Sequence, residues 1–238
     1  MVINLNIDIE YKITNYTEEE INLIKDIFGL FTKDIYFKMK VNEVIDLDKY
    51  EFIGFTGFSG NGKTLIKEEI KKIVDCIDFD DYNNFKEKYG EINIMKLFDI
   101  KDNSTLKVLS KFGLFEMRIL LTPIKNLSNG QIKRLKYIHL INEAIKNNKQ
   151  TILIDEYGSE LDNLSVISFT RALSEYAKEK NIKLFTFGVN DSYIGQLDVN
   201  ELCFVVGNSC ISTKIYNGEV VYNVYNKPIE KIGNLNKF

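Results

Sequence analysis

The sequence predicts an α/β fold with a mostly parallel central sheet, an antiparallel β part and a small helical insertion. An apolar run at residues 53–56 leads into a glycine-rich loop and a helix start, and a second apolar run at 151–154 ends in two acids. Short continuous apolar runs are typical of parallel strands that are buried on both faces. Residues 2–14 instead alternate apolar and polar side chains, which is typical of a strand with one solvated face.

The N-terminal part is predicted to form a strand, a helix and a second strand. Residues 2–14 supply the first strand, and Thr17 with the three glutamates that follow it marks a helix start. A hydroxyl caps free backbone N–H groups at this end of a helix, and carboxylates favour the positive end of the helix dipole. Gly29 is expected to end the helix, and residues 36–41 again have the pattern of a strand.

The middle of the chain is predicted to be a helical insertion over about residues 75–145. Its first part, residues 75–90, gathers acidic and aromatic side chains without a clear period, so we interpret it as a solvated loop in preference to a metal site. Apolar residues return with helical spacing between positions 106 and 115.

The last third continues as α/β and then as β structure. A helix is predicted around Phe169, Leu173 and Ala177, followed by strands at 182–187 and 202–206. Residues 211–225 are predicted to form a hairpin, because Asn217-Gly218 is typical of a type I′ turn. With no repeat or linker visible, residues 1–238 are expected to form a single domain.

Composition narrows the class of protein. The chain has 238 residues, of which 45% are hydrophobic, so it can bury a sizeable core. A net charge of −3 gives no overall basic field for nucleic acid, and three cysteines with one histidine do not suit a zinc site. No stretch approaches 18 apolar residues and the N-terminus lacks the features of a signal peptide. We therefore expect a cytoplasmic protein with no membrane span.

Residues 57–64 match the phosphate-loop pattern G-x-x-x-x-G-K-[ST]. Glycines let backbone N–H groups surround phosphate oxygens, while the lysine reaches the β- and γ-phosphates and the last hydroxyl contacts Mg²⁺. The following helix adds its positive dipole end. The residues expected to bind the nucleotide are Gly57, Ser59, Gly60, Asn61, Gly62, Lys63 and Thr64, with Thr64 also a metal ligand.

Asp155 and Glu156 follow the second buried strand. The ends of parallel strands meet at one edge of a sheet, so these carboxylates are expected near the phosphate loop. Asp155 can hold Mg²⁺ directly or through water, and Glu156 can orient or deprotonate the attacking water. Ser128 is predicted to cap a further helix that begins at 129.

Four motifs occur in the order found in the ABC-type ATPase domain, which residues 36–225 therefore resemble. They are the phosphate loop, Leu-Ser-x-Gly-Gln at 127–131, the apolar strand with Asp-Glu, and Ser-x-Leu-Asp at 159–162. The resemblance implies a P-loop NTPase fold of ABC-ATPase type that binds ATP and Mg²⁺ and hydrolyses ATP. It also implies a head-to-tail homodimer, in which Ser128, Asn129 and Gly130 of one copy cap the γ-phosphate held by the other and Asp162 contacts the partner.

A closer resemblance is to a branch in which such an ATPase domain is joined to a predicted acetyltransferase domain. The stretches at 27–30, 127–134 and 155–162 are similar to that branch. We expect no acetyltransferase domain in this chain, because too few residues flank the ATPase part.

Several positions depart from the family's pattern. Asn129 stands where glycine is usual, although asparagine tolerates left-handed backbone better than most residues. No glutamine precedes the signature loop, and Lys96 or Asp99 lies near the position expected for one. The histidine expected after the next strand is also missing.

Asn190 occupies that strand end, where it can hydrogen-bond a γ-phosphate but cannot carry a proton. We therefore assign Asn190, with Lys63 and Glu156, to the catalytic set and expect slow hydrolysis. Tyr36 or Phe37 is the candidate for stacking on adenine.

The leading hypothesis is a soluble homodimeric ATPase that closes around two MgATP and drives or switches an unidentified protein partner. One alternative is the nucleotide-binding subunit of a transporter, and another is a nucleic-acid-associated ATPase of repair or modification type. The last would use a local basic patch formed by Lys133, Arg134 and Lys136, although no sustained heptad run is present. A small-molecule kinase is disfavoured by the signature-like loop.

Overall fold

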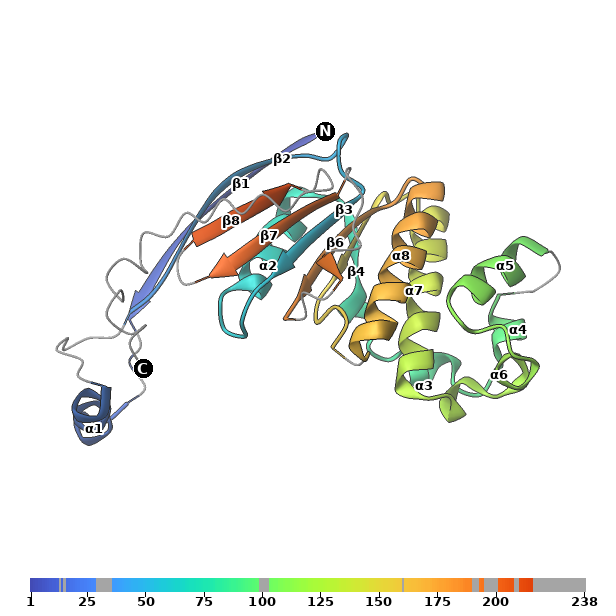
Figure 1. Ribbon diagram of the computed structural model, residues 1–238, viewed down its shortest axis with the longest axis horizontal. Coiled ribbons are helices and arrows are strands. Elements are labelled where there is room, and N and C mark those ends of the chain that lie inside the picture. The colour runs from blue at the N-terminus through green and yellow to red at the C-terminus, as the bar shows by residue number, and fades with distance from the viewer. Residues whose placement is uncertain are drawn as a thin grey trace.

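The fold is seen in a computed structural model of the 238-residue chain (Figure 1). The structure describes residues 1–12, 14, 16–28, 36–98, 103–159, 161–189, 193–194, 201–207 and 210–215. No helix within these ranges is both long enough and apolar enough to cross a membrane.

A six-stranded sheet forms the centre, with strand order β4-β5-β6-β3-β7-β8. Its strands are β3 (Phe52–Thr56), β4 (Cys76–Asp78), β5 (Thr151–Ile154), β6 (Lys183–Gly188), β7 (Glu201–Gly207) and β8 (Cys210–Ile215). All neighbours are parallel except β7 and β8, which pair antiparallel. This arrangement confirms the predicted mostly parallel sheet. The predicted turn at Asn217-Gly218 lies outside the described residues.

A separate two-stranded sheet covers part of the central one (Figure 1). Strand β1 (Val2–Lys12) pairs antiparallel with β2 (Tyr36–Asp46), and every second residue is buried along most of both strands. The buried side, which includes Leu5 and Val41, packs in one core with Phe55 of β3 and Phe204 of β7. The alternation of apolar and polar residues in the sequence therefore predicts correctly that one side of these strands is buried and the other is solvated.

Helix α1 (Glu18–Phe28) lies at the far end of the β1–β2 pair, called the hairpin below (Figure 1). It begins with a reciprocal cap: the Glu20 N–H donates to Thr17 Oγ1 at 3.2 Å, and the Thr17 N–H donates to the Glu20 carboxylate at 2.8 Å. The predicted N-terminus is thus confirmed, and Gly29, which was expected to end the helix, lies outside the described residues.

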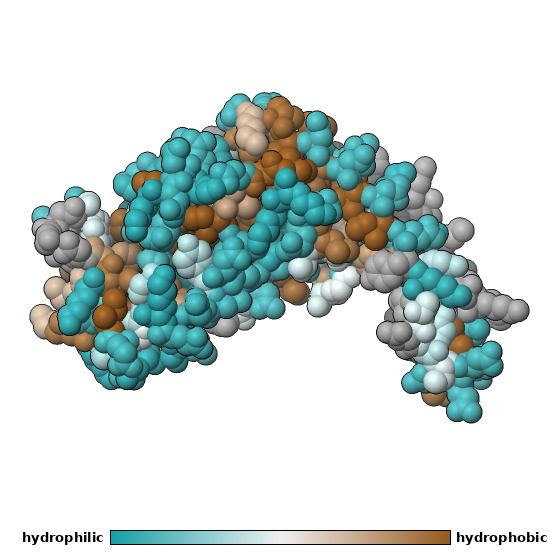
Figure 2. All heavy atoms as spheres, turned by 180° about the vertical axis from the view of Figure 1, so that it is seen from behind, coloured by the Kyte–Doolittle hydropathy of each residue, from teal (hydrophilic) through white to brown (hydrophobic). Residues whose placement is uncertain are grey.

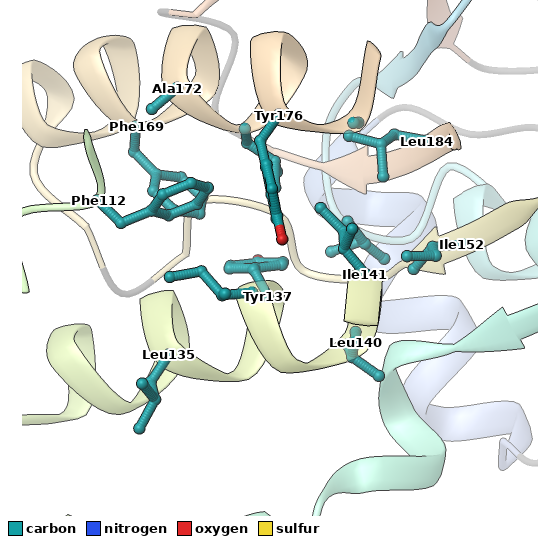
Figure 3. Packing of buried hydrophobic residues seen from close by; sticks show 14 of the residues in the cluster. Phe112, Leu135, Tyr137, Leu140, Ile141, Ile152, Phe169, Ala172, Tyr176 and Leu184 are labelled. Atoms are coloured by element: carbon teal, nitrogen blue, oxygen red, sulfur yellow. The ribbon is translucent and has the colours of Figure 1, made fainter. Parts of the chain in front are cut away.

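The central sheet separates two hydrophobic cores, because successive side chains of a strand point to opposite faces. Ile152, Ile154 and Leu184 belong to one core, whereas Leu153 and Phe185 belong to the other. Helix α2 (Lys63–Ile73) packs with the hairpin on the second face. Helices α7 (Asn129–Lys146) and α8 (Asn163–Glu179) cover the first, as Figure 3 shows for Tyr137, Ile141, Phe169 and Tyr176.

A lobe of short helices joins β4 to α7 (Figure 1). It contains two 3₁₀ turns, η1 (Phe79–Tyr82) and η2 (Ile124–Asn126), and helices α3 (Phe85–Tyr89), α4 (Ile94–Leu97), α5 (Asn103–Lys111) and α6 (Met117–Leu121). The predicted insertion at 75–145 therefore corresponds to this lobe together with β4 and α7.

The prediction of a solvated loop at 75–90 was wrong. The segment forms β4, η1 and α3, and Asp78, Phe79 and Phe85 are all buried. Elements of three to five residues are too short to show a period in the sequence, and buried Asp78 is compensated by ion pairs with Lys67 and Lys71.

His139 connects α7 to the helical lobe inside a group of aromatic rings. Its ring centroid lies 5.0 Å from Tyr89, 5.3 Å from Phe85, 6.2 Å from Tyr82 and 6.5 Å from Phe98. His139 is buried, and its Nε2 has no hydrogen-bond partner among the residues that the structure describes. Burial lowers the pKa of His139, while nearby Glu143 opposes this change and Lys88 and Lys146 add to it.

We predict that His139 makes the protein sensitive to mild acid. Because the folded pKa lies below the unfolded value near 6.5, the unfolded state takes up the proton first, and stability falls as pH drops below about 6.5. The loss should be on the order of 1 kcal/mol for each unit by which the pKa is depressed.

Urea unfolding of wild type and His139→Phe at pH 7.5 and 5.5 tests this. Phenylalanine keeps an aromatic side chain that does not titrate, so its free energy of unfolding should depend less on pH than that of the wild type. The same pH dependence in both proteins would refute the prediction.

Candidate nucleotide-binding site

The phosphate loop connects β3 to α2 and is held closely by two neighbouring strands. Gly57, Gly60 and Gly62 have φ of 151°, 81° and 87°, backbone values that residues with a side chain rarely adopt. A Cβ on Gly57 would lie 2.1 Å from the Val206 carbonyl oxygen of β7, and one on Gly62 would lie 2.5 Å from Met39 Sδ of β2. The loop therefore needs glycine at Gly57 for space as well as for conformation, whereas at Gly62 the flexible Met39 side chain can shift and the positive φ is the main reason for glycine.

The side chains of the loop close it further. Lys63 Nζ donates to the carbonyl oxygens of Gly57 at 2.7 Å and Phe58 at 2.8 Å, so its ammonium lies over the loop backbone. Asn61 Nδ2 donates to the Val206 carbonyl at 3.0 Å. Burial lowers the pKa of Lys63, and the charge of Asp155 opposes this effect.

Thr64 and Asp155 lie together, as the order of parallel strands requires. Asp155 follows β5, and its Oδ2 accepts a hydrogen bond from Thr64 Oγ1 at 3.3 Å. Its Oδ1 accepts from the Glu156 N–H at 2.8 Å. Glu156 has φ of 48°, a left-handed conformation that is uncommon outside glycine, and its side chain is exposed. Thr64 and Asp155 can hold Mg²⁺ with nucleotide phosphates, and Glu156 lies beside them.

Lys63, Thr64, Asp155 and Glu156 all line one cavity of about 760 Å³. Its volume is within the range usual for small-ligand sites. It is lined by Phe37, Ser59, Gly60, Gly62, Lys63, Thr64, Leu65, Asp155, Glu156, Tyr157, Gly158, Ser159, Leu161, Phe187, Gly188 and Val189. Of the two aromatic residues singled out for adenine, Phe37 lines the cavity, whereas Tyr36 is 47% exposed and is not among the described residues around it.

The signature-like loop has a separate position at the start of α7. Ser128 Oγ accepts from the Gln131 N–H at 3.3 Å, and Gln131 Oε1 accepts from the Ser128 N–H at 2.9 Å, which confirms the predicted cap. Asn129 borders a second cavity of about 540 Å³ that reaches Asp155 and Glu156. Among the described linings, Ser128 and Gly130 border neither cavity. Within one chain, these residues are therefore not part of the phosphate-loop cavity.

Four other residues singled out in the sequence lie apart from the cavity or cannot be placed. Asp162 caps α8, where its carboxylate accepts from the N–H and the hydroxyl of Ser165 at 2.9 and 2.6 Å, and these bonds lower its pKa. Asn190 lies outside the described residues, as does Asp99. Lys96 is exposed on α4 and does not line the cavity within the described part of the chain.

The structure adds a charged group that the sequence analysis missed. Lys67, one helical turn after Lys63, is buried beside Asp78, Asp80 and Asp155. The four-residue spacing on α2 is a signal for it, because it places both lysines on one helix face. Among the described residues, no group of three or more His, Cys, Asp or Glu side chains is arranged to hold a metal ion.

The lysines after the signature-like loop also have unexpected positions. Lys133 Nζ donates to Ser159 Oγ at 2.9 Å and to the Glu156 carbonyl at 3.3 Å, and Lys136 Nζ lies 3.5 Å from the centroid of the Phe79 ring. Both side chains are buried, and Arg134 donates to backbone carbonyls. These contacts do not support the suggested local basic patch, since Lys136 connects α7 to η1 and Lys133 connects it to residues beside the cavity.

We predict different effects of alanine at two loop glycines. Gly57→Ala should lower the free energy of unfolding by about 3 kcal/mol, because its Cβ overlaps the Val206 carbonyl between two paired strands. Gly60→Ala is the matched control: its φ is also positive, but no neighbouring atom in the described part of the chain lies within 4 Å of the added Cβ, so only about 1 kcal/mol is expected. Urea unfolding measures both, and equal losses would contradict the prediction.

Comparison with solved structures identifies the fold. The chain superposes on MJ1267, an ATP-binding cassette of an ABC transporter in its ADP conformation, with a TM-score of 0.53 and 14% identity over 90% of this chain and 93% of that one. MJ0796, a dimeric post-hydrolysis cassette bound to ADP and Pi, gives 0.50 and 17% over 87% and 95%. No family model and no curated protein matches the sequence. The chain thus has the P-loop NTPase fold of the ATP-binding cassettes.

Proposed function

We propose that the chain is an ABC-type ATPase that binds ATP and Mg²⁺ in the phosphate-loop cavity and hydrolyses the nucleotide. The observation that carries this proposal is the meeting of Lys63, Thr64, Asp155 and Glu156 at one edge of the sheet, in a cavity of about 760 Å³. A lysine, a hydroxyl, a metal-binding aspartate and a water-orienting group are the parts that phosphoryl transfer to water requires.

Each residue has a role that its position supports. Lys63 exchanges its two carbonyl partners for β- and γ-phosphate oxygens, and the loop N–H groups bind the remaining phosphate charge. Thr64 and Asp155 hold Mg²⁺, which would neutralise charge that develops on the phosphates. Glu156 orients the attacking water and accepts its proton.

The active form is a head-to-tail homodimer. Ser128 and Gly130 do not line the cavity of their own chain, so a second copy is needed to bring a signature-like loop to the phosphates. Exposed apolar residues near the cavity favour such an interface: Phe58 is 80% exposed in the phosphate loop, Leu164 79% at the start of α8, and Val189 59% after β6. A similar fold occurs in the dimeric post-hydrolysis state of MJ0796.

The ATP cycle would drive or switch a protein partner, and slow turnover stays a prediction based on the absent glutamine and histidine. The nucleic-acid alternative loses its main support because Lys133 and Lys136 are buried. Resemblance to the acetyltransferase-linked branch also stays a prediction.

A role as a transporter's nucleotide-binding subunit is the second candidate. The helical lobe exposes Met95, Phe115, Met117 and Leu121, and Figure 2 shows hydrophobic residues reaching the surface of this lobe. Such side chains suit contact with another protein. Copurification of an integral membrane protein with the chain would favour this candidate over a soluble partner.

We predict that Glu156→Gln dimerises when ATP and Mg²⁺ are added. Glutamine cannot accept the proton from water, so the nucleotide persists and the closed dimer accumulates, which light scattering detects as a doubled mass. Ser128→Arg in the same background is the control. It should still bind ATP, because Ser128 lies outside the cavity, but it should stay monomeric, because the bulky side chain blocks the proposed contact of the signature-like loop with the partner's nucleotide. A monomer with ATP shown to be bound to Glu156→Gln would contradict the dimer.

We predict that Phe37, not Tyr36, contributes to ATP affinity. Loss of a base-stacking ring costs about 1–3 kcal/mol, so Phe37→Ala should raise the Kd for a fluorescent ATP analogue by about fivefold or more. Tyr36→Ala, one position earlier on β2, should leave it nearly unchanged. Equal effects of the two changes would exclude this assignment.

A further inference from the structure

The ammonium of Lys67 lies among three carboxylates next to the proposed metal site. Nζ is 2.5 Å from Asp80 Oδ2, 3.4 Å from Asp78 Oδ2 and 3.6 Å from Asp155 Oδ2. The side chain is only 4% exposed. Asp78 ends β4, and Asp80 lies in η1 directly after it. Strand β4 pairs in parallel with β5, the strand that leads to Asp155. Lys67 therefore joins α2 to two neighbouring strand ends.

Asp155 has one carboxylate oxygen close to both Thr64 and Lys67. Its Oδ1 accepts from the Glu156 N–H, while Oδ2 faces both Thr64 Oγ1 at 3.3 Å and the Lys67 ammonium at 3.6 Å. Mg²⁺ bound between Thr64 and Asp155 would use Oδ2, the oxygen that Lys67 already approaches.

Lys67 carries its charge throughout the physiological range. Burial acts to lower its pKa, but the hydrogen bond to Asp80 and the charges of Asp78, Asp80 and Asp155 outweigh burial, so the pKa is raised. Two cations that share one carboxylate oxygen repel each other, and this repulsion is strong where water is scarce.

We propose that Lys67 competes with Mg²⁺ for Asp155, so that the site holds the metal firmly only when a triphosphate supplies further negative charge. This inference rests on the proposed function. Asp80 holds the ammonium when the metal enters, because it is already the nearest partner. Metal binding is thereby linked to Asp78 and Asp80, which lead into the helical lobe.

The test is a titration with Mn²⁺ alone, without nucleotide, in which electron paramagnetic resonance measures how much Mn²⁺ is bound. A charge within about 4–6 Å changes the affinity of a carboxylate for a proton by 1–3 units, and an effect of similar size is expected for a metal. Lys67→Met should therefore bind Mn²⁺ at least about tenfold more tightly than the wild type.

Lys71→Met is the matched control. Lys71 lies one turn further along α2 and also pairs with Asp78, at 2.8 Å, but its other carboxylate partner is Asp81 and not Asp155. It should change Mn²⁺ affinity by less than about threefold. Lys67→Gln, whose amide still donates to Asp80, carries the test if the methionine variant does not fold. Mn²⁺ binding to a folded Lys67 variant that is no tighter than to Lys71→Met would overturn the proposal.

Binding of a fluorescent ATP analogue with Mg²⁺ to the same proteins separates the two proposals. If the wild type does not bind it, the proposed function fails whatever Mn²⁺ does. If it binds but the Lys67 variants match the control in Mn²⁺ affinity, only the competition is wrong.

Discussion

The close approach of Gly57 to the Val206 carbonyl constrains the geometry of the whole site. Strand β3 lies between β6 and β7, so its end cannot move without breaking parallel pairing on both sides. A similar constraint acts one strand away, where a Cβ on Gly188 would lie 2.7 Å from the Tyr157 carbonyl and the Tyr157 N–H donates to Phe187 at 2.8 Å. These backbone contacts bring the phosphate loop and Asp155 to one place.

Two lysines one turn apart on α2 have different electrostatic surroundings. Lys63 donates to backbone carbonyls, which are neutral, and the effect of burial outweighs the charge of Asp155, so the pKa of Lys63 is lowered. Lys67 is near carboxylates, which outweigh burial and raise its pKa. The helix thus presents one ammonium whose partners are neutral and exchangeable, and a second that is strongly paired. This difference fits a role for Lys63 in binding phosphate and for Lys67 in the surroundings of the metal.

Much of the fold could be predicted because the relevant patterns are local. Apolar runs locate β3 and β5, alternation locates β1 and β2, and Ser128 marks the start of α7. The segment from Asp78 to Phe85 could not be predicted, since its elements are short and buried Asp78 depends on lysines from another helix.

The site could be predicted only where a motif defines it. Thr64 and Asp155 meet as expected, but Lys67 belongs to no motif. Buried Lys133 and Lys136 resemble surface residues in the sequence, because their stabilising partners, Ser159 and the Phe79 ring, are distant along the chain. The part of the site that no motif describes is thus the part made of long-range ion pairs and cation–π contacts.

The bonds of Lys63 also bear on the energetics of ligand entry. Its ammonium already lies over the loop, where it donates to two carbonyl oxygens, and Asn61 connects the same loop to β7. Such a loop is preorganised: a ligand replaces two hydrogen bonds of one side chain and orders little backbone, so little conformational entropy is lost on binding.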